Sequence, residues 1–267
     1  MDDNNNNAVI YIPPSGGLGG IVFNRPAVHN ALNPSLMRKV IRYFRKAEND
    51  DSIRVIVLRG NGPSFCAGAD LAWMKKSAKL SEKENLEEAE LLSEFFATIK
   101  HSTKVTIAAV HGNVFGGGNG LVAACDLAYG LNSARFSLSE TRLGLVAATI
   151  SPYMLERLQP HVYKELVFTA RKFDGAEAAQ IGLLNQSFET MGELDTYLEK
   201  TIGAILNGGP RSIEGSKRLI NNLCNPQKAE KTKNQLARIL AEVRITDEAR
   251  EGFSAFLEKR KPKWQNH

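Results

Sequence analysis

A run of glycines, Gly116-Gly117-Gly118-Asn119-Gly120, is the feature of this sequence that most constrains its fold. The run follows a β-branched segment and opens an apolar one, so it lies where an expected strand meets an expected helix. Glycine is costly inside regular secondary structure, and a flexible turn explains one glycine well but three poorly. Close approach of the main chain to a ligand explains all three.

A second turn of small residues, Cys66-Ala67-Gly68-Ala69, ends another expected strand earlier in the chain. The N–H of Ala69 falls where a helix begins, and helix N-termini present free N–H groups and positive potential. Taken alone, this turn is explained equally well as a tight loop without a ligand. Brought together, the two turns can hold one carbonyl oxygen between two N–H donors, which is an oxyanion hole for an enolate or a tetrahedral intermediate.

The spacing of apolar residues predicts alternating strands and helices over the first half of the chain. Strands are expected over residues 18–24, 53–58, 105–110, 126–129 and 134–138, and helices over residues 34–48, from 71, 82–100 and 118–124. This alternation is typical of an α/β fold with parallel strands.

The second half is predicted to be mostly helical, with one strand over residues 183–188. Its helices are expected to begin near Pro152, Tyr163, Ala176, Met191, Pro210, Asn225 and Thr246. We therefore divide the chain into a disordered N-terminal tip (residues 1–14), an α/β core (residues 15–200) and a helical cap or assembly region (residues 201–267).

The composition narrows the class of protein. A chain of 267 residues with 43% hydrophobic residues suits one large domain, or one domain with an appendage. No apolar run approaches the length of a membrane span, and the net charge of +5 suits an anionic ligand or mere solubility. Cys66, Cys125 and Cys224 have neither a zinc spacing nor a disulfide pattern, so we expect no metal and a cytoplasmic location.

Glu140 is the one acidic residue in a plausible site, because it follows a short predicted strand near the two turns. A carboxylate above an oxyanion hole can move a proton to or from the carbon beside a thioester. The alternative is a surface carboxylate paired with Arg142. His111 and Asp126 are better explained as structural residues, and Cys66 lacks an evident histidine partner for nucleophilic chemistry.

Several motifs stand in a fixed order along the chain, and together they carry a resemblance. They are Asn24-Arg25-Pro26 with Asn30-Ala31-Leu32, Phe65 to Leu71, Gly116-Gly117-Gly118, Ala124-Cys125-Asp126, Phe136 to Glu140, and the tail from Glu251 to Lys261. Over residues 15–263 the chain resembles the enoyl-CoA hydratase/isomerase (crotonase) family. The stretches 139–153 and 66–75 look most similar to its bacterial methylglutaconyl-CoA hydratase branch.

The resemblance implies a fold, a substrate and an assembly. The fold would be a crotonase-like spiral of ββα units with a helical C-terminal trimerisation region, forming a homotrimer or a dimer of trimers. The substrate would be an acyl-CoA, so that coenzyme A belongs to the substrate and no separate cofactor is needed. The thioester oxygen would accept hydrogen bonds from the N–H groups of Ala69 and Gly117, with Glu140 as the catalytic acid–base group.

The remaining site residues follow from the same resemblance. The main chain near Ala67 would meet the adenine, and the phosphates of coenzyme A would contact Arg25 and either Lys259 or Lys261, the lysine from a neighbouring subunit. Trp73, Met74 and Gly120 would line the acyl pocket. Hydratases of the family carry a further glutamate at the position of Gly120, so its loss here leaves two reactions open: hydration of a 2-enoyl-CoA and Δ3,Δ2-isomerisation.

A different class of function, RNA binding, rests on basic residues that crowd one predicted helix. They are Arg38, Lys39, Arg42, Arg45 and Lys46, and most of them lie close to one helix face. Some relatives of the family bind RNA, but a solvated basic face is the better explanation. We therefore expect neither nucleic-acid nor membrane partners.

Overall fold

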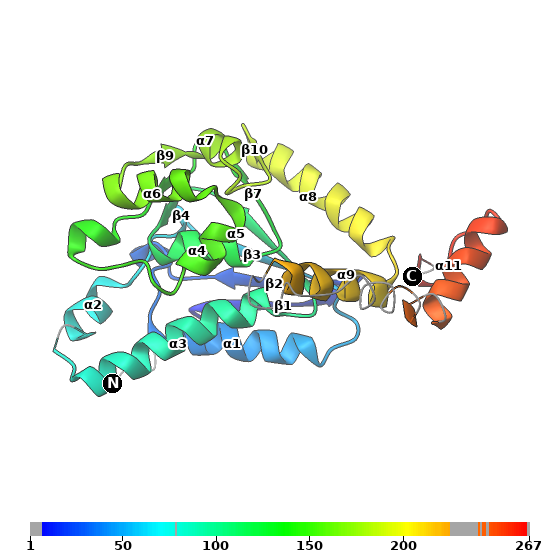
Figure 1. Ribbon diagram of the computed structural model, residues 1–267, viewed down its shortest axis with the longest axis horizontal. Helices are drawn as coiled ribbons and strands as arrows, with labels where there is room; N and C mark the ends of the chain where they lie inside the picture. Colours follow the sequence, from blue (N-terminus) through cyan, green and yellow to red (C-terminus); the bar gives the residue numbers. More distant parts are fainter. Residues whose placement is uncertain (1–6, 78, 225–239, 241, 244–245, 266–267) are drawn as a thin grey trace.

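The computed structural model describes residues 7–77, 79–224, 240, 242–243 and 246–265, and two sheets form its centre (Figure 1). The larger sheet has the spatial order β1 (Val9–Ser15), β2 (Leu18–Phe23), β3 (Val55–Gly60), β5 (Val105–Val110), β7 (Leu127–Leu131) and β10 (Gln186–Phe188). Strands β2 to β10 of this sheet pair in parallel, and β1 pairs antiparallel with β2. The predicted α/β class with parallel strands is therefore confirmed.

The smaller sheet contains β4 (Ser64–Cys66), β6 (Asn113–Phe115), β8 (Arg135–Ser137) and β9 (Phe173–Asp174). Strands β4, β6 and β8 each follow a strand of the larger sheet after a short turn, and a helix follows each pair. These helices are α2 (Leu71–Ser77) with α3 (Glu82–Lys100), α4 (Gly117–Ala124) and the 3₁₀ helix η3 (Glu140–Leu143). This repetition is the spiral of ββα units that we expected, and it stacks the ends of β4, β6 and β8 side by side.

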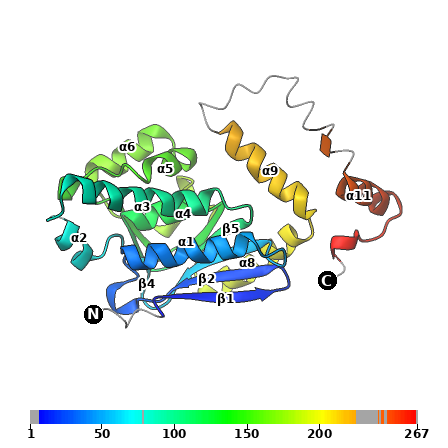
Figure 2. The ribbon, with the colours of Figure 1, turned by 90° about the horizontal axis from the view of Figure 1, so that it is seen from below.

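Both faces of the larger sheet are covered. Alternate residues of a strand point to opposite faces, so Ile56 and Leu58 join one core while Val55 and Val57 join another. The first core contains buried residues of α3 and of α1 (Pro34–Glu48), which lie side by side in Figure 2. The second core is closed by α8 (Met191–Leu206).

Helix α1 begins and ends where the sequence predicts. The side chain of Asn33 accepts a hydrogen bond from the N–H of Leu36 (2.9 Å), and Pro34 occupies the first turn. Its buried side chains recur at helical spacing and pack toward α3; they are Leu36, Met37, Val40, Ile41, Phe44 and Ala47.

Besides α8, further helices follow η3 in the chain. They are α5 (Ser151–Arg157), α6 (Pro160–Thr169), α7 (Gly175–Gln180) and α9 (Pro210–Leu223), followed by α11 (Asp247–Leu257), which lies apart from the sheets (Figures 1 and 2). Glu248 of α11 accepts hydrogen bonds from the N–H groups of Arg211 and Ser212, which joins α11 to the start of α9. The helix predicted to begin near Asn225 lies outside the described residues.

Two boundaries of the three predicted regions of the chain differ from the structure. Residues 9–14, which we expected in a disordered tip, form most of β1, an edge strand where Pro13 and Pro14 are tolerated. The boundary at residue 200 falls inside α8, which continues to pack on the sheet through Ile202. No helix of the described part of the chain is long and apolar enough to cross a membrane.

Candidate active site

The two small-residue turns lie against each other. Gly68 has a φ of +90°, and a Cβ built on it would be 2.9 Å from the carbonyl oxygen of Phe115 and 3.8 Å from the Cα of Gly116. A Cβ on Gly118 would be only 2.3 Å from the carbonyl oxygen of Cys66. Any side chain at these glycines would push the turns apart, so the close approach explains why the sequence has glycine there.

The N–H group of Ala69 is free to bind a ligand. Leu32 pairs with the turn on both sides of Ala69, because its N–H donates to the carbonyl of Gly68 (2.7 Å) and its carbonyl accepts from the N–H of Asp70 (2.9 Å). Among the described residues, no backbone or side-chain acceptor takes the N–H of Ala69 itself. The turn is thus held rigidly with one donor unused.

Gly117 supplies the corresponding donor of the second turn. It is the first residue of α4, so its N–H has no partner within the helix. The preceding residue, Gly116, has φ +49° and ψ −120°, a conformation that favours glycine. Because Gly68 and Gly116 are neighbours, the main chains that carry the two free N–H groups run close together, as the predicted oxyanion hole requires.

The carboxylate of Glu140 lies beside these turns. Its Oε1 would be 3.2 Å from a Cβ on Gly116, and its Oε2 is buried without a hydrogen-bond partner in the described part of the chain. Burial raises the pKa of Glu140 above the ordinary glutamate value, although a hydrogen bond from its own N–H acts in the opposite direction. The suggested pairing with Arg142 is wrong, since that guanidinium donates to the carbonyl of Thr169.

The raised pKa predicts how activity depends on pH. A general base works in its ionised form, so kcat/KM falls as the pH drops through the pKa of that base in the free enzyme. Because burial shifts the pKa of Glu140 upward, the acidic limb of the pH profile should lie above the ordinary glutamate value of 4.5. A pH profile of kcat/KM checks this, and an acidic limb below pH 4.5 would contradict the assignment of Glu140 as the base.

Gly120 lies one turn after Gly117 on α4, and no space is left beside it. A Cβ on Gly120 would be 2.2 Å from Cγ2 and 2.9 Å from Cβ of Ile150, and 3.0 Å from Cε1 of Phe96. Ile150 and Phe96 are both fully packed in the core. The space beside position 120 is therefore closed by apolar side chains. No local pattern in the sequence indicates this contact, because Ile150 and Phe96 come from distant segments.

Arg25 braces the first turn. Its guanidinium donates to the carbonyl of Ala31 (2.6 Å) and to Oδ2 of Asp70 (2.7 Å). Burial of Asp70 works to raise its pKa, but the hydrogen bonds from Arg25 and from the N–H groups of Trp73 and Ala72 outweigh it and lower the pKa. These contacts place Arg25 next to the turn, and its contact with a phosphate stays a prediction.

The predicted acyl and adenine contacts lie around the same turn. Ala67 precedes Gly68, and its N–H donates to the carbonyl of His29 (3.0 Å). Trp73 and Met74 are half-buried on α2, and Nε1 of Trp73 donates to Oε2 of Glu88 on α3 (2.7 Å). The N–H groups of Trp73 and Met74 donate to Asp70, so both residues lie next to the turn that carries Ala69, and their contact with an acyl group stays a prediction.

Lys259 and Lys261 lie elsewhere. Both are exposed and follow α11, which Figures 1 and 2 show well separated from α4 and α2. A single chain therefore does not bring these lysines to the two turns. Their contact with coenzyme A stays a prediction that requires a neighbouring subunit.

Other candidates for chemistry have structural roles. Burial raises the pKa of the Cys66 thiol to about 12, which leaves it un-ionised and unsuited to nucleophilic attack. His111 contacts the carbonyl of Gly62 (2.8 Å), and Asp126 accepts from the N–H of Thr106 (2.8 Å). The described residues hold no cluster that could bind a metal ion.

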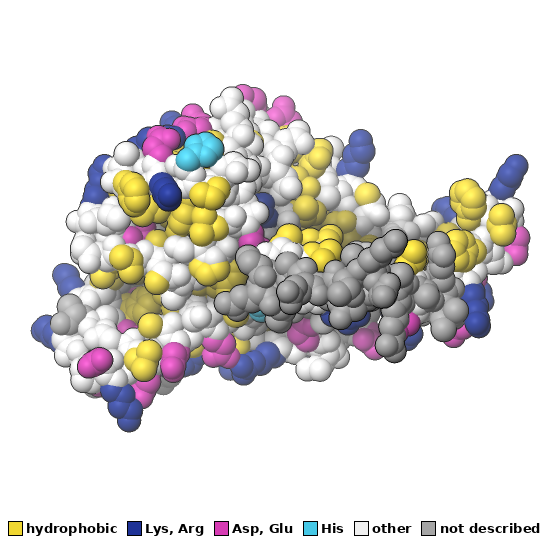
Figure 3. All heavy atoms as spheres, in the orientation of Figure 1, with side chains coloured by type: hydrophobic (Ala, Val, Ile, Leu, Met, Phe, Trp, Pro, Cys, Tyr) yellow, Lys and Arg dark blue, Asp and Glu magenta, His cyan; other side chains and the backbone are white. Residues whose placement is uncertain are grey.

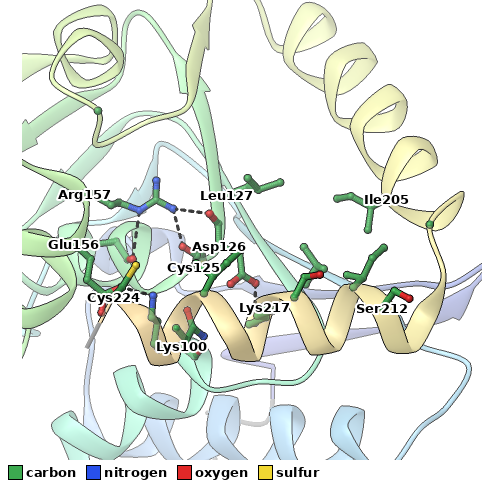
Figure 4. Close-up of a pocket in the computed structure, with 18 of the residues that line it drawn as sticks. Lys100, Cys125, Asp126, Leu127, Glu156, Arg157, Ile205, Ser212, Lys217 and Cys224 are labelled. Carbon is green, nitrogen blue, oxygen red and sulfur yellow. Dashed lines mark hydrogen bonds and ion pairs between the residues drawn. The ribbon is translucent and has the colours of Figure 1, made fainter. Parts of the chain in front are cut away.

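A cavity of about 760 Å³ lies between α9 and the sheet, but it is not this site (Figure 4). Its charged side chains are engaged with protein groups: Nζ of Lys217 donates to Oδ2 of Asp126 (2.7 Å), and Arg157 donates to the carbonyl of Cys125 (2.6 Å). Neither turn nor Glu140 lines the cavity. The two turns and Glu140 therefore remain the candidate site.

The similarity of the chain to known proteins identifies its family. Residues 14–267 match the profile of the enoyl-CoA hydratase/isomerase family. The chain belongs to this family. A crotonyl-CoA hydratase of Syntrophomonas wolfei is 32% identical over 246 residues, which cover 91% of this chain and 93% of that protein. A peroxisomal Δ(3,5)-Δ(2,4)-dienoyl-CoA isomerase of Arabidopsis thaliana is 28% identical and covers 91% of both chains.

The fold agrees with this membership. The crystal structure of an enoyl-CoA hydratase from Shewanella pealeana superimposes with a TM-score of 0.90 at 30% identity, covering 96% of each chain. The predicted crotonase-like fold is thus confirmed, and the protein is an enzyme of the hydratase or isomerase type that acts on an acyl-CoA. The relatives do not single out one acyl group.

Proposed function

We propose that this protein is an enoyl-CoA hydratase that adds water across the 2,3 double bond of an acyl-CoA thioester. The observation that carries the proposal is the carboxylate of Glu140, whose Oε2 is buried without a hydrogen-bond partner in the described part of the chain. It lies beside two turns with free N–H groups at Ala69 and Gly117. The crotonyl-CoA hydratase named above supports the reaction class.

The chemistry uses one carboxylate for both proton transfers. The ionised carboxylate of Glu140 takes a proton from water while the water oxygen bonds to C3. The π electrons of the double bond move toward the carbonyl, and the negative charge develops on the thioester oxygen between Ala69 and Gly117. Glu140 then delivers its proton to C2, which leaves a 3-hydroxyacyl-CoA and regenerates the carboxylate.

The oxyanion donors supply the main electrostatic stabilisation. Removing one such donor costs about 10²–10³ in kcat in other enzymes. A single carboxylate suffices when water and proton add to the same face of the double bond. The apolar packing at Gly120 leaves no second acid–base group on that part of α4.

The role of the Gly117 N–H as an oxyanion donor can be tested with two substitutions at that position, proline as the test and alanine as its control. Gly117→Pro removes the N–H, whereas Gly117→Ala keeps it and brings its Cβ to 3.0 Å from the flexible end of Leu32. Proline is tolerated at the first position of a helix. We expect Gly117→Pro to lower kcat by about 10²–10³ and Gly117→Ala to lower it far less. Equal activity of two folded variants, with circular dichroism as the folding check, would remove Gly117 from the oxyanion hole.

For the substrate we propose a branched enoyl-CoA, 3-methylglutaconyl-CoA. The support is the similarity of residues 139–153 and 66–75 to the methylglutaconyl-CoA hydratase branch. The test is a panel of crotonyl-CoA, 3-methylcrotonyl-CoA and 3-methylglutaconyl-CoA under identical conditions. The proposal predicts that 3-methylglutaconyl-CoA has the highest kcat/KM of the three. A kcat/KM for 3-methylglutaconyl-CoA that is equal to or lower than that for crotonyl-CoA would overturn the proposal.

A Δ3,Δ2-isomerase is the second candidate, because the closed space at Gly120 removes a water anchor. In that reaction Glu140 takes a proton from C2 of a 3-enoyl-CoA and returns it to C4, so no water is needed. Hydration of crotonyl-CoA and isomerisation of 3-hexenoyl-CoA, assayed side by side, separate the two. Isomerisation without hydration would favour the second candidate.

We also propose that the enzyme works as a homotrimer or a dimer of trimers. Apolar side chains on α11 are exposed, namely Phe253, Phe256 and Leu257, and Figure 3 shows hydrophobic side chains on this projecting end. Exposed apolar patches of this kind mark interaction surfaces. A neighbouring subunit's α11 would also bring Lys259 or Lys261 toward coenzyme A. Sedimentation analysis tests the assembly.

A further inference from the structure

Asn119 is a buried polar residue that the proposed mechanism does not use. Its side-chain nitrogen Nδ2 lies 2.9 Å from the carbonyl oxygen of Ser137 and 3.2 Å from those of Val114 and Gly116. All three partners are acceptors, so the amide must present its NH₂ group to them. The side chain therefore ties the glycine turn to two neighbouring strands, β6 and β8.

The contact with Gly116 bears on the oxyanion donor. The carbonyl oxygen of Gly116 accepts from the backbone N–H of Asn119 (2.9 Å) as well as from its Nδ2. A trans peptide is planar, and its C=O and N–H point in opposite directions. Holding the carbonyl of Gly116 therefore fixes the direction of the N–H of Gly117, which belongs to the same peptide unit.

The contact with Ser137 reaches the acid–base group. The carbonyl of Ser137 accepts from Nδ2 of Asn119 and from the N–H of Gly116 (3.0 Å). Ser137 ends β8, and the chain continues directly to Glu140 at the start of η3. One amide group thus links the turn that carries the donor to the strand that carries the carboxylate.

The side chain of Asn119 also carries an energetic cost. The Oδ1 atom of Asn119 is buried without a hydrogen-bond partner in the described part of the chain. Such an atom loses its hydrogen bonds to water and gains none in return. An apolar side chain of similar size would avoid this cost, but it would lose the three hydrogen bonds from Nδ2 to the turn and to the two strands.

We propose that Asn119 is a positioning residue that aims the N–H of Gly117 at the thioester oxygen and fixes its distance from Glu140. This inference rests on the proposed oxyanion hole. Loss of the amide should weaken the polarisation of the bound thioester more than it weakens binding, because the residues predicted to contact the adenine and phosphates of coenzyme A are other than Asn119. The effect should therefore appear in kcat rather than in KM.

The experiment compares wild type with Asn119→Leu and Asn119→Asp. Leucine has similar volume and no donor, and aspartate has at most one donor hydrogen where asparagine has two. We expect kcat to fall about 10- to 100-fold in both variants, which is no more than the fall in kcat when a whole oxyanion donor is removed. We expect KM to change less than about threefold. Thr106→Val is the control, since it also replaces a buried polar side chain by an apolar one, away from the site.

A spectroscopic probe reports on the donor directly. The absorbance of 4-dimethylaminocinnamoyl-CoA moves to longer wavelength when its carbonyl oxygen accepts strong hydrogen bonds. We expect a red shift on binding to wild type and to Thr106→Val, and a smaller one with folded Asn119→Leu at saturation. A full red shift and wild-type kcat in Asn119→Leu would overturn the role of Asn119. Absence of any red shift with wild type would instead overturn the oxyanion hole itself.

Discussion

Replacing Glu140 by glutamine is expected to lower kcat/KM by about 10²–10⁴, the usual contribution of general acid–base catalysis. The amide keeps the volume of the side chain but cannot accept and return a proton. Both candidate reactions should be slowed by Glu140→Gln, because hydration and isomerisation both transfer their protons through Glu140. Assays of crotonyl-CoA and 3-hexenoyl-CoA with the variant measure the loss, and near-normal turnover of either would contradict the mechanism.

The stability of the same variant provides its control. Burial raises the pKa of Glu140 in the folded state, so ionisation of this group opposes folding. The stability that it contributes is present below its unfolded pKa and is lost as the pH rises through the folded pKa. Glu140→Gln should therefore be at least as stable as wild type at pH 7. A thermal melt that shows a destabilised variant would assign the activity loss to unfolding.

Most of the fold was predictable from the sequence because helix caps and the spacing of apolar residues indicate the same elements that the buried side chains form. In α1, the Asn33 cap, Pro34 and the helical spacing of apolar residues all indicate one helix, and the structure has it over Pro34–Glu48. In β1, two prolines weaken the local signal for a strand, and the strand forms through its pairing with β2. Tertiary pairing of this kind has no local signal.

The site was predictable where the chemistry depends on the main chain. Glycine and alanine at the ends of two strands indicate free N–H groups, and the structure places the two turns together as expected. Interactions between distant side chains were not predictable. The ion pair between Arg25 and Asp70 at the first turn joins residues that are 45 positions apart, and nothing in the sequence links Ile150 to Gly120.

Introducing a glutamate at position 120 is expected to abolish activity rather than to add a second catalytic group. Its Cβ alone would lie 2.2 Å from Cγ2 of Ile150, a branched atom close to the backbone that has little freedom to move away. Overpacking of a core costs about 1–3 kcal/mol, and the buried carboxylate adds its own desolvation cost. We expect Gly120→Glu to lose at least 100-fold in kcat/KM or to melt at a clearly lower temperature.

Matched variants separate packing from chemistry. Gly120→Ala should already lower the melting temperature. Adding Ile150→Ala should cost less stability in the Gly120→Ala variant than in wild type, because it removes the 2.2 Å contact with Cγ2. Gly203→Ala is the control, since a Cβ there meets nothing within 4 Å and alanine favours a helix by about 0.5–1 kcal/mol. If Gly120→Glu folds normally and hydrates crotonyl-CoA faster than wild type, the space beside Gly120 is open in solution. In that case a carboxylate at position 120 can hold the attacking water, and wild type lacks only that contact. The apolar packing by Ile150 would then not determine which reaction the enzyme catalyses.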